Sequence, residues 1–251
     1  MIYKQSSIDL FAALVASLTF PVTIRSIVNA GGGKHTITVC DMYHAQPGFD
    51  VTIGGKKYKI EDIIPGSKED CTARVYDVLK VKGDSANITA TTFEMYKPFF
   101  FYGTPMAEGT ELAQENIAKN KTPMYWLRLD DFSDHVYPND GLERKERDIK
   151  ARIYPLTQAN HEKWLTEQAT KEAVKPMYRL AEILVKAIEA RPERFDTDTF
   201  EYDIPAVYPK FGVITINRGV EKSLWHDKLG GVELAINLTV YKQTICDECE
   251  S

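Results

Sequence analysis

The segment from Gly231 to Tyr241 constrains the fold more than any other part of the chain. Apolar side chains occupy every second position from Val232 to Val240, and the positions between them are more polar. Successive side chains of a β-strand point to opposite faces, so this period of two predicts a strand with one buried face. The apolar face of such a sheet has to be covered by another layer of structure.

The N-terminal segment 6–19 is predicted to be a helix. Its apolar residues recur at spacings of three and four, and Ser6 with Asp9 resembles a capping box. A secretory signal peptide is the alternative, because Lys4 precedes a largely apolar stretch. Asp9 interrupts the apolar region that a signal peptide needs, which favours the helix.

Further helices are predicted at 108–120 and 166–190. Thr166 suits the N-cap of the second of these, and Pro176 is expected to kink or split it because proline lacks an N–H. Additional strands are predicted at 123–129, 148–156 and 211–216. These elements predict an α+β fold: a mainly antiparallel sheet with flanking helices.

A small β subdomain is predicted at 35–97, where short β-type runs alternate with turn signals. Gly54-Gly55 lies between two such runs and predicts a two-residue hairpin. The subdomain is expected to be a barrel, SH3-like or OB-like, or a set of hairpins. We therefore divide the chain into an N-terminal helix and connection at 1–34, the inserted β subdomain at 35–97, an α+β core at 98–245 and a flexible acidic tail at 246–251.

Two segments allow a structural and a functional interpretation. The string PFFFYGTP at 98–105 is either a buried crossing strand or an apolar patch for a neighbouring subunit. The charged stretch 130–147 is predicted to be a long solvated loop, and loops of this length in compact domains usually have a function.

Composition argues against several classes of protein, although mild acidity does not forbid contact with DNA. The net charge is -5, whereas proteins that grip duplex DNA through its phosphates are usually basic. Four scattered cysteines do not form a disulfide framework, so a reducing compartment is expected. No run approaches the roughly 18 apolar residues of a membrane helix, so no membrane partner is expected.

No sequence motif indicates an enzyme, and we assign no catalytic, cofactor-binding or metal-ligating residues. Gly33-Lys34 lacks the other residues of a P-loop, and His161-Glu162 lacks the second histidine of a zincin helix. An unlikely alternative is a metal-dependent hydrolase using the acidic cluster Asp130, Asp131, Asp134 and His135.

Two other groups of residues have binding alternatives. Cys246 and Cys249 form a C-x-x-C that either ends a solvated tail or binds metal with distant partners. Lys56, Lys57 and Lys59 are where phosphate contact is expected if the β subdomain is a nucleic-acid- or ligand-binding module. A plain hairpin surface is the simpler interpretation of these lysines.

Three strings taken together resemble a class of virion proteins of tailed bacteriophages, notably of crAss-like and related phages of Bacteroidetes. They are MYKPFFFYGTPMAEGTEL, TPMYWLRLDDF and LWHDKLGGVELAINLTVYKQ. Together with a Lys-Pro-initiated helix at 175–184, they occur in the family's order over roughly residues 90–242. The segment 223–227 matches only part of an Asn-containing element that precedes the last strand in that class.

This resemblance implies a head–tail connector or tail-completion protein and no catalytic residues. It implies a closed ring of about six or twelve copies, joined head to tail and stacked on neighbouring portal, connector or tail proteins. DNA would pass through the ring without sequence-specific binding. The expected location is the neck or tail of the virion, after assembly in the host cytoplasm.

Overall fold

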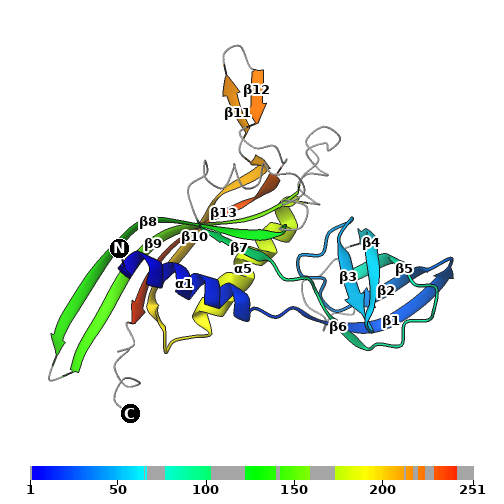
Figure 1. The fold of residues 1–251 in the computed structure, drawn as a ribbon, viewed down its shortest axis with the longest axis horizontal. Coiled ribbons are helices and arrows are strands. Elements are labelled where there is room, and N and C mark those ends of the chain that lie inside the picture. The colour runs from blue at the N-terminus through cyan, green and yellow to red at the C-terminus, as the bar shows by residue number, and fades with distance from the viewer. Residues whose placement is uncertain are drawn as a thin grey trace.

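The computed structural model describes residues 2–64, 66, 77–102, 122–139, 142–158, 173–211, 213–216, 220–223 and 229–241. This part of the chain contains a closed β-barrel, a five-stranded sheet, a two-stranded sheet and two helices. The barrel lies at one end of the long axis, and the sheet fills the middle and the other end (Figure 1). The predicted α+β class with a small barrel-like subdomain is confirmed.

The barrel consists of six antiparallel strands and closes where β6 pairs with β1. In barrel order the strands are β1 (Pro21–Gly31), β2 (Lys34–Val39), β5 (Asp77–Gly83), β4 (Lys56–Ile64), β3 (Asp50–Ile53) and β6 (Thr92–Glu94). Alternate side chains such as Ile37, Ile60 and Leu79 fill its interior. The barrel begins at Pro21 and not at residue 35, because β1 pairs with both β2 and β6.

Glycines shape two turns of the barrel. Gly54 and Gly55 both have positive φ, as a type I′ turn requires, and they join β3 to β4 as predicted. Gly33 precedes β2 with a φ of +74°, and a Cβ there would lie only 2.3 Å from the carbonyl oxygen of Gly83. Gly33 is therefore required by the close approach of two backbone segments within the barrel.

The central sheet has the strand order β10, β13, β9, β8, β7. Their bounds are β7 (Phe99–Tyr102), β8 (Met124–Asn139), β9 (Leu142–Gln158), β10 (Phe195–Phe211) and β13 (Leu229–Tyr241). All neighbours are antiparallel except β7 and β8, which are parallel. The Phe-rich segment is thus an edge strand: Phe99 is 44% exposed, whereas Phe100 and Tyr102 pack against the core.

Two helices, α1 (Ile2–Ser17) and α5 (Lys175–Glu189), pack against one face of this sheet. The predicted apolar stripe of α1 is confirmed, since it is buried from Ile8 to Leu18. The capping box is wrong, because α1 begins at Ile2, before Ser6. Pro176 lies in the first turn of α5, where a missing N–H removes no helical hydrogen bond. Residues 173–174 before α5 form a π-helical turn, and the part of the predicted helix before residue 173 lies outside the described residues.

The predicted loop 130–147 is wrong, because β8 and β9 continue through most of it as paired strands. Their register runs from Met124↔Leu156 to Asn139↔Leu142. The strand β10 was also not predicted. Most of its described side chains are exposed or half-exposed, so the apolar alternation that identifies a strand is weak. Thr166, His161, the segment 108–120 and the tail 246–251 lie outside the described residues.

The loop between β2 and β3 holds the barrel against the sheet. Thr157 of β9 donates to Gln46 Oε1 at 2.5 Å, and Arg179 of α5 pairs with Asp41. His44 from the same loop is fully buried, and its Nε2 donates to the carbonyl oxygen of Tyr96 at 2.7 Å. The barrel is thereby fixed to the sheet by side chains as well as by its two covalent connections, which follow α1 and precede β7.

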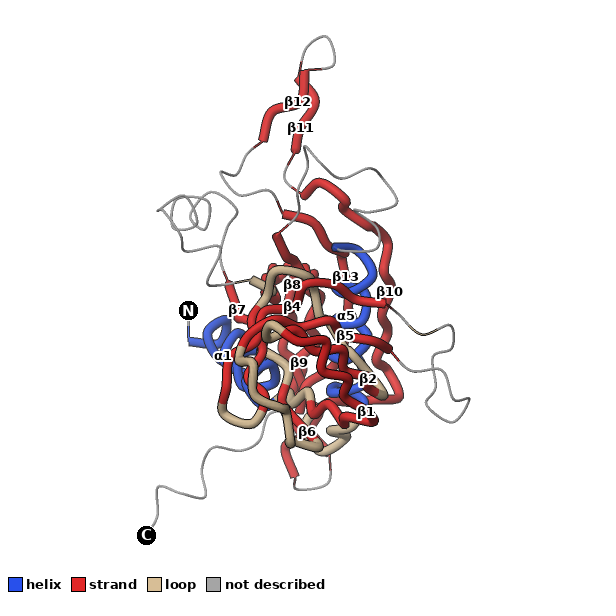
Figure 2. The backbone as a smooth tube through the Cα atoms, turned by 90° about the vertical axis from the view of Figure 1, so that its right-hand side faces the viewer, coloured by secondary structure: helices blue, strands red, loops and turns tan. Residues whose placement is uncertain are grey.

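Two ribbons of two strands extend from the sheet (Figure 1). The first is the end of the β8–β9 hairpin, whose last four pairs lie beyond the final β9–β13 pair, Tyr241↔Glu146. The second is β11 (Val213–Ile216) paired with β12 (Val220–Ser223). This second ribbon stands apart from the barrel in both views (Figures 1 and 2).

Two further expectations concern cysteines and membranes. The sequence analysis predicted no disulfide, but Cys40 is disulfide-bonded, and the other three cysteines lie outside the described residues. Pairing depends on which cysteines the fold brings together, which their number does not reveal. Among the described residues, no helix has the length and apolar character needed to span a membrane.

Candidate functional site

The sheet face that the helices leave uncovered carries the most organised polar cluster of the described residues. Ile149, Ala151 and Ile153 of β9 point toward the helices, so the residues between them point away. Arg152 of β9 therefore lies on the uncovered face, directly opposite Arg128 of β8. Two like charges in this position repel each other unless an anion lies between them.

A β-bulge supplies that anion. Leu129 pairs with Ala151 and Asp131 pairs with Lys150, so Asp130 is an extra residue in β8. Bulges redirect side chains, and they often do so beside functional sites. The Asp130 carboxylate lies 2.9 Å from Arg128 Nε through Oδ1 and 2.7 Å from Arg152 Nε through Oδ2. Asp130 thus neutralises the opposed pair of arginines.

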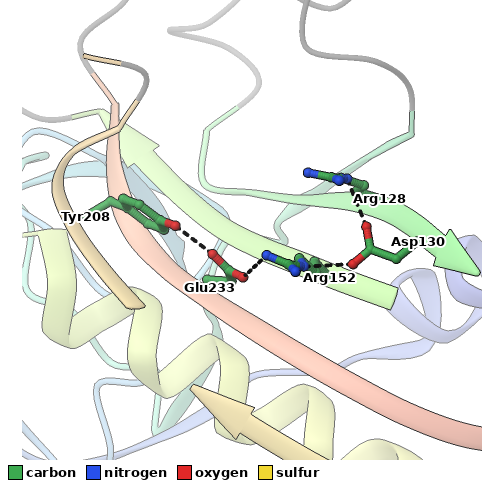
Figure 3. Close-up of polar contacts among 5 residues, drawn as sticks. All are labelled: Arg128, Asp130, Arg152, Tyr208 and Glu233. Carbon is green, nitrogen blue, oxygen red and sulfur yellow. Dashed lines mark hydrogen bonds and ion pairs between the residues drawn. The ribbon is translucent and has the colours of Figure 1, made fainter. Parts of the chain in front are cut away.

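The cluster continues across two more strands, as Figure 3 shows. Arg152 Nη1 donates to Glu233 Oε1 of β13 at 2.9 Å. The hydroxyl of Tyr208 on β10 donates to Glu233 Oε2 at 2.6 Å. Four strands are therefore connected by one chain of charged and polar contacts, which we call the polar ladder: Arg128, Asp130, Arg152, Glu233 and Tyr208.

Glu233 is the buried member of the polar ladder, with 4% exposure. A buried carboxylate is tolerated when both oxygens have partners, and here Arg152 and Tyr208 provide them. Burial, reinforced by the hydrogen bond to Glu233, raises the pKa of Tyr208 to about 12. The hydrogen bonds and charge of Asp130, followed by the charge of Glu233, raise the pKa of Arg152. The tyrosine therefore remains a donor and Arg152 remains a cation near neutral pH.

An open hollow of about 720 Å³ adjoins the ladder. Its polar lining comes from Asp130, Lys150, Arg152, Glu201, Asp203 and Asn237. Arg152 is held by Asp130 and Glu233 and also hydrogen-bonds Tyr154. The hollow therefore offers carboxylate acceptors as well as the cations Lys150 and Arg152 to a polar group on a partner surface.

An aromatic cluster borders the ladder on the same face. Trp126 and Tyr154 lie 5.1 Å apart between ring centroids, and Phe211 lies edge-on to Trp126 at 5.7 Å. Tyr208 packs against Phe211 as well as donating to Glu233, so it joins the cluster to the ladder. The cluster makes this end of the uncovered face rigid, and it lies where the chain leaves for the β11–β12 ribbon.

Of the residues of the alternative hydrolase site, the structure describes only the side chain of Asp130. Asp130 binds two arginines, and a carboxylate committed to arginines is a poor ligand for Mg²⁺ or Ca²⁺. Asp131, Asp134 and His135 belong to β8, and their side chains lie outside the described part, as do Cys246 and Cys249. Within the described residues no three His, Cys, Asp or Glu side chains are grouped to hold a metal.

Arg152, Glu233 and Tyr208 were not predicted as site residues from the sequence. Glu233 was recognised only as a polar position of the alternating strand. A carboxylate there could have been flagged, but its partners lie 81 and 25 residues away in the chain.

Comparisons with models of protein families, with curated proteins and with solved structures found no match.

Proposed function

We propose that this chain is a structural ring subunit of a tailed bacteriophage, at the head–tail junction or the top of the tail. It binds copies of itself and the adjoining portal, connector or tail proteins, and it performs no catalysis. The sequence resemblance supports the location in the virion. The geometry supports an assembling subunit through one observation, which is the pair of projecting two-stranded ribbons.

A two-stranded ribbon without a third strand is only marginally stable in water. Four pairs at the end of the β8–β9 hairpin and four in β11–β12 have no third strand in the described part of the chain. Each ribbon gains a stabilising surface if it packs on a neighbouring subunit. The two ribbons and the barrel extend in three directions (Figure 1), as a subunit with several neighbours requires.

The sheet edges supply a second surface for neighbours. Tyr202 and Val207 of β10 are each 52% exposed, and Phe99 of β7 is exposed at the opposite edge. Edges on opposite sides of one sheet suit head-to-tail contacts, in which each copy uses two different surfaces. We propose closure at about six or twelve copies around a channel for DNA.

Imaging of assembled particles tests this proposal directly. We expect a closed ring of this chain at the neck or upper tail in electron cryomicroscopy of particles that contain it. A distribution over the whole capsid, or absence of the chain from particles, would show that the proposal is wrong.

A shortened-arm variant tests the role of the ribbon. Replacing residues 136–145 with a two-residue Asn-Gly turn removes the unsupported pairs and keeps those that β13 flanks. We expect a folded protein with a nearly unchanged melting temperature that no longer enters particles. Deletion of residues 250–251, which keeps all four cysteines, is the control, and we expect it to enter particles normally. Normal incorporation of the shortened arm would remove the main structural support.

A further inference from the structure

The outer face of the barrel carries three lysines in one row across three neighbouring strands. Lys34 of β2 lies directly opposite Lys82 of β5, and Lys82 lies directly opposite Lys59 of β4. All three side chains are exposed. Like charges directly opposite each other destabilise a sheet, so local folding does not explain this arrangement.

The row differs from the lysines that the sequence singled out. Lys56 lies 3.1 Å from Asp84, so a carboxylate of the barrel already compensates it. Lys59 instead lies directly opposite Lys82, and Lys34 lies on the other side of Lys82. The row therefore depends on the pairing of three strands, and it cannot be recognised from the spacing of lysines in the sequence.

The acids near the row only partly compensate it. Asp50 lies opposite Lys59 at one end, and Glu61 lies 3.9 Å from Lys34 through an exposed contact. Exposed pairs of this kind are weak. Lys57 adds a further exposed lysine two positions before Lys59.

We infer that this lysine row binds the phosphate backbone of double-stranded nucleic acid. Strands lie about 4.8 Å apart, so the row spans roughly 10 Å of a rigid surface. Lysine is a point charge that binds phosphate without distinguishing bases. The most exposed aromatic side chains described, Phe99, Tyr178 and Tyr202, lie outside the barrel, so the row lacks a stacking platform of the kind that single strands prefer.

This inference does not rest on the proposed ring, because binding is measured on the isolated full chain. The probe is a short fluorescent DNA duplex of arbitrary sequence, titrated with protein over a series of salt concentrations. Each phosphate contact contributes a slope of about -0.9 to log affinity against log salt, so three lysines contribute about -2.7. A fourfold rise in salt then weakens their contribution about 40-fold.

The variant Lys34→Gln/Lys59→Gln/Lys82→Gln is expected to remove about 2.7 of this slope without lowering the melting temperature. The matched control, Lys175→Gln/Lys186→Gln, removes two exposed lysines from α5 and is expected to leave the slope unchanged. Asp50→Asn removes the anion at the end of the row and is expected to tighten binding. A loss of fold does not produce such a gain.

Three results would overturn the inference. The first is that the wild-type chain does not bind the duplex at low salt, and the second is that the triple variant binds with an unchanged slope. The third is that the triple variant lowers the mass of the protein in solution without changing DNA binding. That outcome would show that the lysine row binds an acidic surface on a second copy of the chain.

Discussion

The joint between barrel and sheet is predicted to weaken in mild acid because of His44. This ring is fully buried, lies edge-on to Phe20 and Tyr96, and donates from Nε2 to the Tyr96 carbonyl oxygen. Among the described residues, its Nδ1 has no hydrogen-bond partner. Protonation would therefore place a charge and an unsatisfied N–H in an apolar site, and this desolvation lowers the pKa of His44 to about 4.

The sign and size of the effect follow from these values. The unfolded chain binds a proton near the ordinary pKa of 6.5, whereas the folded chain binds it only near 4. Stability is fully present above pH 6.5 and is lost as the pH falls from 6.5 to 4. At about 1.4 kcal/mol per pKa unit, His44 accounts for a loss of about 3 kcal/mol over this window.

Urea unfolding at a series of pH values between 4 and 7.5 measures this loss. The comparison variant is His44→Phe, which keeps an aromatic ring but cannot be protonated. We expect it to be less stable at pH 7, because the Tyr96 carbonyl loses its donor, and to be less sensitive to pH by about 3 kcal/mol between 6.5 and 4. Parallel curves for the two proteins would refute the reasoning, because the pH dependence would then come from other groups.

Three further predictions concern the polar ladder and the barrel. Tyr208→Phe should lower the free energy of unfolding by about 1 kcal/mol at pH 7. Glu233→Gln should change the free energy of unfolding less in the Tyr208→Phe background than alone, and additive effects in urea unfolding would contradict the hydrogen bond between the two side chains. Gly33→Ala should lower the melting temperature more than Gly32→Ala, because only the first Cβ meets backbone; equal losses would show that φ alone matters. Lys82→Thr should raise barrel stability by roughly 0.2–1 kcal/mol by relieving repulsion from Lys34 and Lys59, and a loss in urea unfolding would contradict this.

The sequence predicts those elements whose two faces differ in polarity. The alternation of 231–241 was found as the strand β13, although Gly231 and Glu233 on its opposite face are buried as well. The stripe of α1 reflects burial on one side and was also found. The segment 130–147 and the strand β10 are polar or exposed along most of their length. Cross-strand hydrogen bonds hold such strands in place, and these leave little trace in the local composition.

The polar ladder was unpredictable for a different reason. It depends on a bulge at Asp130 that shifts the register of β8 against β9 by one residue. Without that shift, strand pairing places Arg128 opposite Arg152 with no anion between them. The sequence shows which charged residues are present, but the register of several strands determines which side chains come into contact.

The two places where like charges face each other support the assignment of the lysine row. At Arg128 and Arg152 the chain contributes a bulged carboxylate that contacts both cations at less than 3 Å. Strand β4 also contains a bulge, but its extra residue, Glu61, contacts only Lys34, at 3.9 Å through an exposed pair. Within the described part of the chain, neither Lys59 nor Lys82 has a carboxylate at ion-pair distance. The fold thus neutralises the opposed arginines with its own carboxylate but leaves the opposed lysines without one. An anion that compensates the lysine row is therefore best supplied by another molecule. A polyphosphate backbone supplies it along the whole row, whereas a single carboxylate would neutralise one position only.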